Sequence, residues 1–535
     1  MARPAAGDPS RPLRRSVPIL IGILALAALA RLTGLSYDLP FIYHPDEPFN
    51  VDIVQTMFRT GDLNPHLFVY PSLSYYVNAI AYVPYYYAAR LVGVIQARSD
   101  IAPLVELVMG AVKAPLPSTI VLGRLLSVVF SVGTVGLTFL LGKRLLHDTR
   151  IAALAATLVA IAPPFVVLGR LITPDAFVVF FAMACVYFAA RIFQEGRTWQ
   201  YVAAGIAAGL AASSKYNGGL VVVSIAAAHV LRYGWAGWKV PAIYAALACA
   251  SLAFVAGTPY AVIDYRTFAE FVIIDGRHYA GGHPGMEGDT LRWYLNYMAT
   301  TAAVAYALAA LEIGRGIVRR SKPILVLAAF PIAYFTFIAL FVVRNDRTLH
   351  PLIPLAFLLA ASGLVRGWDR ARGLHPEVTR SPAIAGLAIL VVAMVVQPAI
   401  HTIADMKALF SIDSRETARR WIADNLPRGS RIAIESYSPF VDPKDFQVQG
   451  MEQAIDHEPQ WFAERGFDYV VCSEGMYKRY FTDRERYSTQ ASRYEALFAR
   501  YDPALKVFDD GNYEIRIYEV GRHLDSARAT FPASR

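Results

Sequence analysis

The chain has 535 residues, of which 55% are hydrophobic, and a formal net charge of +9 at pH 7. Repeated apolar runs near the ~20 residues that span a bilayer exclude an ordinary soluble protein and indicate a polytopic membrane protein. Because the basic residues are spread over short loops between these runs, the positive charge is typical of membrane topology, and nucleic acid is not expected as a partner.

The first apolar run, VPILIGILALAALA, covers residues 17–30. Many further runs follow it and no clear small-residue cleavage site ends it, so we interpret it as a retained first span, 17–35, rather than a signal peptide. Ten later runs also predict spans. They lie at 119–142, 151–168, 174–193, 200–215, 218–233, 240–257, 291–312, 323–343, 349–365 and 382–400.

Residues 74–95 decide the topology, because a crossing there would move every later loop to the other side of the membrane. If this segment does not cross, the predicted cytoplasmic loops carry Lys and Arg at more than twice the density of the shorter external loops. The segment is also rich in Tyr, which is typical of the water–lipid boundary. We therefore expect an interfacial helix, eleven spans and one long first external loop, residues 36–118.

The first loop opens with FIYHPDEPFNVD, residues 41–52. Two adjacent carboxylates, Asp46 and Glu47, follow His44 and lie between two prolines directly after the first span. They can cap the following helix or solvate the loop. Alternatively, one of them can accept a proton from an attacking hydroxyl at the membrane surface.

Three further motifs place polar residues at predicted external ends of spans. These residues are Arg170 and Asp175 in GRLITPDAF, Lys215 in SSKYNGG, and Arg344, Arg347 and His350 in RNDRTLHP. Asp175 can cap its helix, and Lys215 or Arg344 can reach lipid headgroups. Acids and bases that converge on one membrane face instead predict chemistry on a membrane-borne phosphate ester, in which bases hold the phosphate and a carboxylate accepts a proton.

The character of the sequence changes after residue 400. RETARRWIADNL predicts an amphipathic helix, and RIAIESY, DYVVCSE and YEIRIYEV predict strands. We expect a transmembrane domain over 1–400 and a soluble α/β domain over 401–535. Because eleven is an odd number of spans and the N-terminus is predicted to be cytoplasmic, the soluble domain is expected on the extracytoplasmic side. Cys472 has no cysteine partner in this domain, so no disulfide is expected within it.

The sequence resembles the GT-C membrane glycosyltransferases through an ordered set of motifs. These are HPDE, PSLSYYVNAIAY, GRLLSVVFSVGTVGLTFLLGKRLL, GRLITPDAFVVFF, GLAASSKYNG and RTLHPLIPLAFLLA. The similarity is greatest to the protein O-mannosyltransferase-like group, which includes the lipid A aminoarabinose transferase, and runs from residue 17 to about 365. The tail also resembles the soluble module of many such bacterial enzymes.

The resemblance implies a GT-C architecture with about 11 transmembrane helices, located in the inner or plasma membrane. It implies a sugar donor linked to polyprenyl phosphate, used on the extracytoplasmic face, and a protein, lipid or glycan acceptor. An acidic residue of the first loop is the implied catalytic base, which here is Asp46 with Glu47 beside it. Asp175 matches the second acidic position, so Asp46, Glu47 and Asp175 are the implied catalytic residues.

The implied substrate-binding residues are mostly basic. They are His44, Arg124 of GRLLS, Arg170, Lys215, Arg344, Arg347 of RTLHP, and His350. Arg124 and Arg347 match recurrent basic positions of the family. Thr348 stands where the family often has Tyr, so the assignment of His350 is less secure than that of Arg347.

We expect a single inverting displacement, in which Asp46 deprotonates the acceptor hydroxyl and the lipid phosphate leaves, held by Arg347 with Lys215 and Arg124. A covalent glycosyl-enzyme is chemically feasible but unnecessary with a phosphate leaving group. No cofactor is required. A divalent cation such as Mg²⁺ or Mn²⁺ could bridge Asp46 and Asp175, although no further ligand cluster accompanies them.

Two other classes stay open, a flippase for lipid-linked sugars and a non-enzymatic scaffold for envelope assembly. A transporter is expected to place polar groups near the bilayer midplane, on broken helices in repeated halves, and the sequence shows neither feature. A scaffold would place function in the tail alone. Residues 270–289, within the predicted external loop 258–290, are either a lid over the site or a flexible connector.

Overall fold

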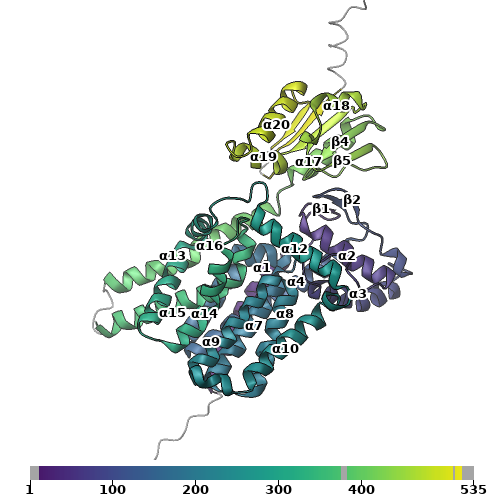
Figure 1. Cartoon of the computed structure of the whole chain (residues 1–535). Coiled ribbons are helices and arrows are strands. Elements are labelled where there is room, and N and C mark those ends of the chain that lie inside the picture. The colour runs from purple at the N-terminus through teal and green to yellow at the C-terminus, as the bar shows by residue number, and fades with distance from the viewer. Residues whose placement is uncertain (1–10, 375–381, 510–511, 521–535) are drawn as a thin grey trace, which may run out of the picture. The chain divides into compact units, whose positions relative to one another are not determined.

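The computed structural model describes residues 11–374, 382–509 and 512–520, which fall into two compact units. Unit 1 consists of Met1–Leu35, Asp62–Pro84 and Leu122–Ala408, and unit 2 of Ser36–Gly61, Tyr85–Val121 and Leu409–Arg535. Figure 1 shows the helices of unit 1 and the sheets of unit 2. The basic residues predicted on the cytoplasmic side within 1–10 and 375–381 lie outside the described part of the chain.

Unit 1 is built from helices that overlap all eleven predicted spans. They are α1 (Arg11–Leu32), α4 (Pro117–Leu146), α5 (Thr149–Ile161), α6 (Pro163–Val167), α7 (Asp175–Gln194), α8 (Thr198–Ser214), α9 (Val222–Tyr233), α10 (Ala242–Gly257), α13 (Thr290–Val318), α14 (Lys322–Ile338), α15 (Ile353–Leu374) and α16 (Pro382–Ala408). Helix α3 (Leu73–Leu91) occupies the predicted interfacial segment.

Among the described residues, five helices are long and apolar enough to cross a membrane, and a bent pair, Thr149–Ile161 with Pro163–Arg170, would make a sixth. Three further apolar helices are shorter: Ser16–Leu32, Ala242–Gly257 and Lys322–Ile338. The predicted class, a polytopic helical membrane protein with a C-terminal α/β domain, is confirmed. The number of eleven crossings stays a prediction.

Short 3₁₀ helices lie at three of the polar motifs found in the sequence. They are η2 (Leu168–Arg170) before α7, η3 (Tyr216–Val221) before α9 and η5 (Asp346–Leu352) before α15. Such pieces are common where a longer helix begins or ends. The predicted loop 258–290 is also mainly helical, with α11 (Tyr260–Ile263) followed by α12 (Tyr265–Gly281).

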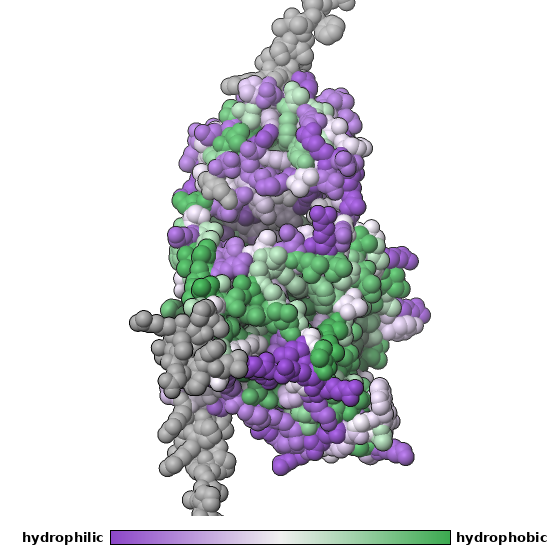
Figure 2. All heavy atoms as spheres, turned by 90° about the vertical axis from the view of Figure 1, so that its left-hand side faces the viewer, coloured by the Kyte–Doolittle hydropathy of each residue, from purple (hydrophilic) through white to green (hydrophobic). Residues whose placement is uncertain are grey.

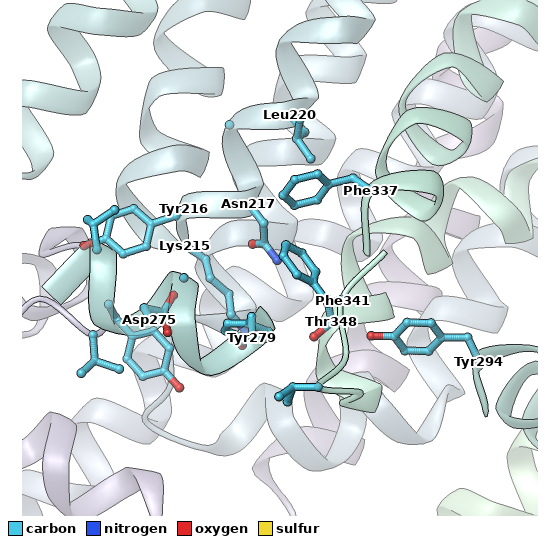
Figure 3. Close-up of a pocket in the computed structure, with 16 residues that line it drawn as sticks. Lys215, Tyr216, Asn217, Leu220, Asp275, Tyr279, Tyr294, Phe337, Phe341 and Thr348 are labelled. Carbon is cyan, nitrogen blue, oxygen red and sulfur yellow. The ribbon is translucent and has the colours of Figure 1, made fainter. Parts of the chain in front are cut away.

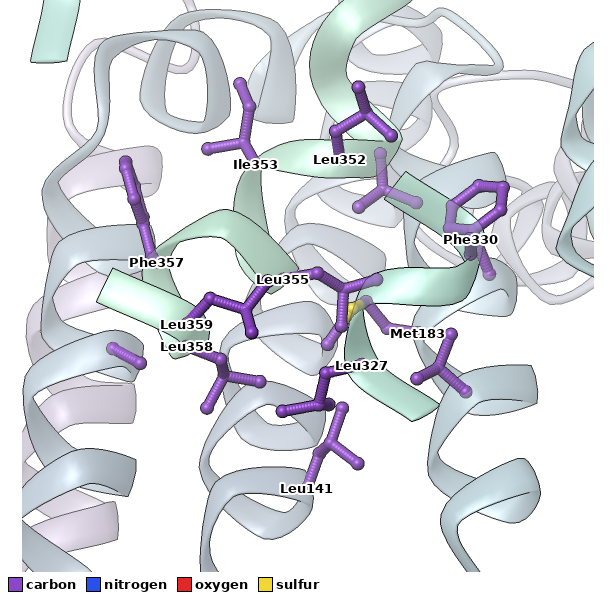
Figure 4. Close-up of a cluster of buried hydrophobic side chains, with 14 of the residues drawn as sticks. Leu141, Met183, Leu327, Phe330, Leu352, Ile353, Leu355, Phe357, Leu358 and Leu359 are labelled. Atoms are coloured by element: carbon purple, nitrogen blue, oxygen red, sulfur yellow. The ribbon is translucent and has the colours of Figure 1, made fainter. Parts of the chain in front are cut away.

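The core of unit 1 lies where α4, α7, α14 and α15 meet (Figure 4). Leu141, Met183, Leu327 and Leu358, one from each helix, are fully buried there. These helices are apolar on more than one side, which is expected of helices that pack on several neighbours. The core holds the N-terminal ends of α7 and α15 in fixed positions, and these ends carry two of the polar motifs.

One face of α16 is apolar and exposed. Its large exposed side chains are Ile389, Val392, Val396, Ile400 and Ile403. Their spacing of three and four residues puts them on one side of the helix, as expected of a surface that faces lipid. Figure 2 shows hydrophobic residues gathered over the helices of unit 1, whereas hydrophilic residues cover most of the visible surface of the C-terminal domain.

Unit 2 contains two sheets. The larger has the strand order β5-β4-β6-β8-β7, in which β4 is parallel to β5 and β6, and β8 is antiparallel to β6 and β7. The strands are β4 (Arg431–Glu435), β5 (Gln447–Met451), β6 (Tyr469–Ser473), β7 (Lys506–Phe508) and β8 (Ile515–Glu519). The smaller sheet, order β1-β3-β2, comes from the first loop: β1 (Phe41–Ile42), β2 (Val105–Val108) and β3 (Ala111–Lys113).

The helices of unit 2 are α2 (Asp46–Thr60), α17 (Ser414–Asn425), α18 (Pro459–Glu464), α19 (Glu474–Thr482) and α20 (Ser488–Tyr501). The predicted tail helix corresponds to α17, and the three predicted strands correspond to β4, β6 and β8. β4 and β6 have continuous buried runs, as expected of inner strands covered on both faces, whereas burial in β8 is interrupted.

Within unit 2, the first loop and the C-terminal sheet domain fold together. The Arg415 guanidinium lies 4.4 Å from the ring centroid of Tyr43 and donates to the Tyr43 carbonyl at 3.1 Å. The Tyr437 backbone N–H donates to the Met109 carbonyl at 2.7 Å. Side chains of the loop also join the hydrophobic cluster of the sheet, among them Ala111, which is fully buried. The two parts of the first loop in unit 2, Ser36–Gly61 and Tyr85–Val121, therefore belong to the C-terminal body, whereas Asp62–Pro84 belongs to unit 1.

Candidate active site

Asp175 and Lys215 form a buried ion pair in unit 1. Asp175 is the first residue of α7, and Lys215 stands between α8 and η3. The Lys215 Nζ lies 3.0 Å from Oδ1 of Asp175, and the two side chains are 14% and 4% exposed. Burial makes a lone charge costly, so each group depends on the other. The Lys215 ammonium is therefore held inside the unit, and the alternative that it reaches lipid headgroups is not observed.

Arg347 and His350 join this pair from the η5 helix. Both interact electrostatically with the Asp175 carboxylate. The Asn345 side chain accepts the Arg347 backbone N–H at 2.9 Å, which fixes the start of η5. His350 is buried, with its ring centroid 5.9 Å from that of Phe165. Two permanent cations, Lys215 and Arg347, thus lie close together beside Asp175, and such a pair suits an anionic ligand.

A cavity of about 430 Å³ lies beside Lys215 (Figure 3). Much of its wall is apolar. The apolar residues are Val69, Leu220, Val272, Phe337, Phe341 and Val343. The polar ones are Tyr70, Lys215, Asn217, Asp275, Tyr279, Tyr294 and Thr348. The cavity therefore combines an apolar wall with a cationic end at the Asp175 ion pair.

Helix α12 supplies two polar groups at the cationic end. Asp275 and Tyr279 are four residues apart, so they lie on one face of the helix. Burial raises the pKa of the Tyr279 hydroxyl, so this group stays protonated at neutral pH and can donate to an anion. Burial also raises the pKa of Asp275, while His278 and Lys215 act in the opposite direction.

Sequence reasoning named neither Asp275 nor Tyr279 as a site residue. Both lie in the quoted stretch 270–289, whose role could not be assigned from its residues. The signal that could have found them is their helical spacing next to an apolar run, FVII, in a segment predicted to be external. Tyr70 was missed for a different reason, because its approach to Lys215, 5.9 Å from ring centroid to Nζ, depends on tertiary packing.

Arg124 and Arg170 are both buried and bonded to backbone carbonyls. Arg124 Nη1 donates to the Leu35 carbonyl at 2.8 Å, and Arg170 Nη1 donates to the Thr33 carbonyl at 2.8 Å. Arg170 Nε also donates to the Val166 carbonyl at 2.9 Å. The two arginines thus fix the segment that follows α1. Their contact with substrate stays a prediction.

Arg344 lies at the start of the RNDRTLHP motif and is half-buried. Its backbone N–H donates to the Met286 carbonyl at 2.9 Å. Its guanidinium packs on Gly288, where a Cβ would meet Nη1 at 2.7 Å and where φ is +138°, so only glycine fits there without strain. Arg344 therefore anchors the segment after α12, and its predicted role in binding is untested.

His44, Asp46 and Glu47 belong to unit 2. Asp46 and Glu47 form the first turn of α2, whose N-cap is Pro45, so neither carboxylate occupies the capping position. The Asp46 backbone N–H donates to Nδ1 of His44 at 3.2 Å. Asp46 is half-buried, whereas Glu47 is fully buried. The structure thus brings together Asp175, Lys215, Arg347 and His350 in unit 1, and groups the three first-loop residues in unit 2.

The residues around Asp175 do not form a metal site. No group of three or more His, Cys, Asp or Glu side chains that could hold a metal ion occurs within the described ranges. A cation bound at Asp175 would also compete with the Lys215 ammonium at 3.0 Å. We therefore derive no step through a metal.

Three solved structures of known proteins agree with the architecture. The oligosaccharyltransferase of Archaeoglobus fulgidus in the apo form has 13% identity, a TM-score of 0.55, and coverage of 91% of this chain and 72% of that one. ArnT from Cupriavidus metallidurans bound to undecaprenyl phosphate has 14% identity and a TM-score of 0.53, and the match covers 95% of this chain and 98% of ArnT. AglB from Archaeoglobus fulgidus, in complex with an inhibitory peptide and a dolichol-phosphate, has 13% identity, a TM-score of 0.51, and coverage of 92% and 74%.

At these identities the structures show a shared fold, that of the GT-C glycosyltransferases. Residues 100–260, which contain α4 to α10, match the family model of the dolichyl-phosphate-mannose-protein mannosyltransferases. The shared fold and this match both agree with the resemblance of the motifs to the GT-C membrane glycosyltransferases. A search of the curated proteins gave no significant match.

Proposed function

We propose that the protein transfers a sugar from a polyprenyl-phosphate donor to an acceptor at the extracytoplasmic membrane face, with inversion at the anomeric carbon. One observation supports this most directly, the cavity whose apolar wall ends at Lys215. A donor of this class has a long apolar chain next to a phosphate, and such a cavity suits both parts. Two proteins of the same fold were solved with undecaprenyl phosphate and with dolichol-phosphate.

In this proposal, Lys215 and Arg347 bind the phosphate and stabilise it as it leaves with the bonding electron pair. Asp175 orients the Lys215 ammonium, because its carboxylate is already engaged at 3.0 Å. The Tyr279 hydroxyl adds a neutral donor to the same anion. Asp175 is thus proposed as a positioning residue rather than as a second base.

We propose Asp46 as the general base. Its carboxylate accepts the proton of the acceptor hydroxyl while that oxygen bonds to the anomeric carbon and the bond from this carbon to the phosphate oxygen breaks. The proposal rests on the place of Asp46 in the HPDE motif and on the family resemblance. The difference in burial supports it, because a half-buried carboxylate is accessible to an acceptor and the fully buried Glu47 is not.

The test uses the purified full-length protein in liposomes with synthetic polyprenyl-phosphate sugars and candidate acceptors. A glycosyltransferase is expected to form glycosylated acceptor and free polyprenyl phosphate. Movement of the donor across the bilayer without this product would instead support the flippase. Neither activity with any donor would favour the scaffold. Mass analysis of envelope glycans in cells with and without the gene identifies the sugar and the acceptor.

A further inference from the structure

A second cavity lies at the opposite end of α7 from Asp175. It has a volume of about 620 Å³ and is lined by Leu140, Lys143, Arg144, His147, Tyr187 and Gln194. The residues come from the C-terminal ends of α4 and α7 and from the turn after α4. Because α7 has 20 residues and a helix rises 1.5 Å per residue, this cavity is about 30 Å from the candidate active site.

Basic groups outnumber acidic ones around this second cavity. Glu195 pairs with Arg144 and also lies 3.5 Å from Arg191 Nη2 and 3.5 Å from Arg197 Nε, while the nearby Asp148 pairs with Arg150. Lys143 donates to the Thr149 hydroxyl at 2.5 Å, and no described carboxylate forms an ion pair with it. The cavity therefore has uncompensated positive charge, which favours an anionic ligand.

Exposed apolar side chains lie along α4 on the same side of the helix as Lys143. Leu125, Val129 and Leu140 are 38%, 64% and 37% exposed. At 100° per residue, these three and Lys143 lie within about 60° of one another around the helix axis. A ligand bound at Lys143 can therefore extend along an apolar surface, which a free inorganic anion does not require.

Aromatic side chains mark the same end of the helices as a water–lipid boundary. Trp199 is exposed, and the Arg191 guanidinium lies 4.3 Å from its ring centroid. Tyr187 lines the cavity itself and is half-buried. Trp and Tyr are enriched where headgroups meet hydrocarbon. Basic pockets between spans at this depth are suited to acidic lipid headgroups.

We propose that this second cavity binds the headgroup of an anionic phospholipid, with the phosphate at Lys143 and His147 and the acyl chains along the apolar face of α4 from Leu140 toward Val129. The site is separate from glycosyl transfer and stands whether or not the proposed activity is found. Its chemistry, a phosphodiester with an apolar tail, distinguishes it from a site for free phosphate.

The test titrates the delipidated full-length protein with phosphatidylglycerol or with phosphatidylcholine and counts bound lipids by native mass spectrometry. Lys143→Glu is expected to weaken phosphatidylglycerol binding by about tenfold or more, since each basic residue near a headgroup contributes about 1 kcal/mol and 1.4 kcal/mol is tenfold. Lys322→Glu makes the same charge change at an exposed position outside the cavity and is expected to have little effect.

A second variant, His147→Asp, tests the same site in case Lys143→Glu does not fold. His147 is exposed and has φ of +57°, a conformation that Asp tolerates, so His147→Asp adds negative charge without backbone strain. It is also expected to weaken phosphatidylglycerol binding. Equal losses in Lys143→Glu and Lys322→Glu, or no loss in His147→Asp, would overturn the site. Displacement of the lipid by millimolar inorganic phosphate would overturn the choice of a lipid.

Discussion

The ammonium of Lys215 lies 3.0 Å from the carboxylate of Asp175, and neither side chain is more than 14% exposed. Asp175 stands where an N-terminal capping residue would be expected, but the N-cap of α7 is Pro174, and the carboxylate turns to Lys215 instead. The pair joins the start of α7 to the end of α8. The Asp175–Lys215 pair therefore connects two helices and also forms the cationic end of the cavity. Mutations can separate its contribution to stability from its contribution to binding.

Lys215→Met should leave the buried Asp175 carboxylate without its ion-pair partner at 3.0 Å and lower the free energy of unfolding by up to about 3–5 kcal/mol. The double variant Asp175→Leu, Lys215→Met removes both charges and should recover most of this stability. It should not recover sugar transfer, because the proposed mechanism assigns phosphate binding to the ammonium. Denaturant unfolding and turnover, measured on the same preparations, check both outcomes.

A control for this pair is Arg150→Met, which removes an exposed ion pair with Asp369 and should change stability by no more than about 1 kcal/mol. Full turnover in the double variant would show that Lys215 does not bind the phosphate.

Asp46→Asn should lower the single-turnover rate by a factor on the order of 10²–10⁴ while donor affinity changes little, because the amide keeps the shape but loses the basicity. Glu47→Gln, in a fully buried position, should affect stability more than rate. Rapid-quench kinetics and donor binding, measured separately for each variant, give the comparison. Near-normal chemistry in Asp46→Asn would refute the assignment, and a selective collapse in Glu47→Gln would transfer the role to Glu47.

Gly450→Ala should destabilise unit 2 by about 1–3 kcal/mol, because the new Cβ has no space. It would lie 2.2 Å from the Leu107 carbonyl oxygen and 2.4 Å from Cγ1 of Val108. Thermal unfolding and protease sensitivity of the first loop report the loss. Gln449→Ala, one residue earlier and exposed, is the control. Equal melting temperatures for the two variants would contradict the packing of β2 on β5.

Glu435 should make the stability of unit 2 fall as the pH rises. Its buried carboxylate accepts from the backbone N–H groups of Ala454 and Ser473 and from the Tyr494 hydroxyl, and burial raises its pKa to about 7. The unfolded chain releases this proton near pH 4.5, so between about pH 4.5 and 7 the folded state holds a proton that the unfolded state lacks. Over this range the free energy of unfolding should drop by up to about 3 kcal/mol.

Thermal unfolding of the wild type and of Glu435→Gln, compared at pH 5 and pH 8, isolates this contribution. The variant cannot titrate at this position, so its stability should change less with pH than that of the wild type. The same pH slope in both proteins would show that Glu435 is ionised throughout the range.

Arg98 is predicted to be external, since residues 74–95 are expected not to cross, and His147 is predicted to be cytoplasmic, because the span at 119–142 separates the two positions. Cysteines introduced at these two exposed positions, in a chain with Cys249 replaced by Ser, should react with an impermeant reagent from opposite sides. Labelling of the cysteine at position 98 from the cytoplasmic side would show that residues 74–95 cross, and would invert every later loop.

Much of unit 1 could be predicted from the sequence because the length of each apolar run by itself indicates a membrane-spanning helix. The runs at 174–193 and 349–365 correspond to α7 and α15. Lys215 was predicted for the same reason, as a charge at the end of such a run. The hydrogen bonds of Arg124 and Arg170 to backbone carbonyls were not predictable, because every residue carries a backbone carbonyl and the sequence does not show which one accepts. The sequence also gave no sign of the contact between Tyr43 and Arg415, because contacts between distant segments follow no periodicity.

That contact has a consequence for the order in which the protein is made. The strands β1, β2 and β3 leave the ribosome before most helices of unit 1, whereas the sheet on which they pack is translated last. At ~5–20 residues per second, the loop waits on the order of tens of seconds for its partner. During that time Leu107, Val108 and Ala111, which join the core of the C-terminal sheet, are uncovered. The newly made loop is therefore a transient target for proteases and chaperones until the last strand is complete.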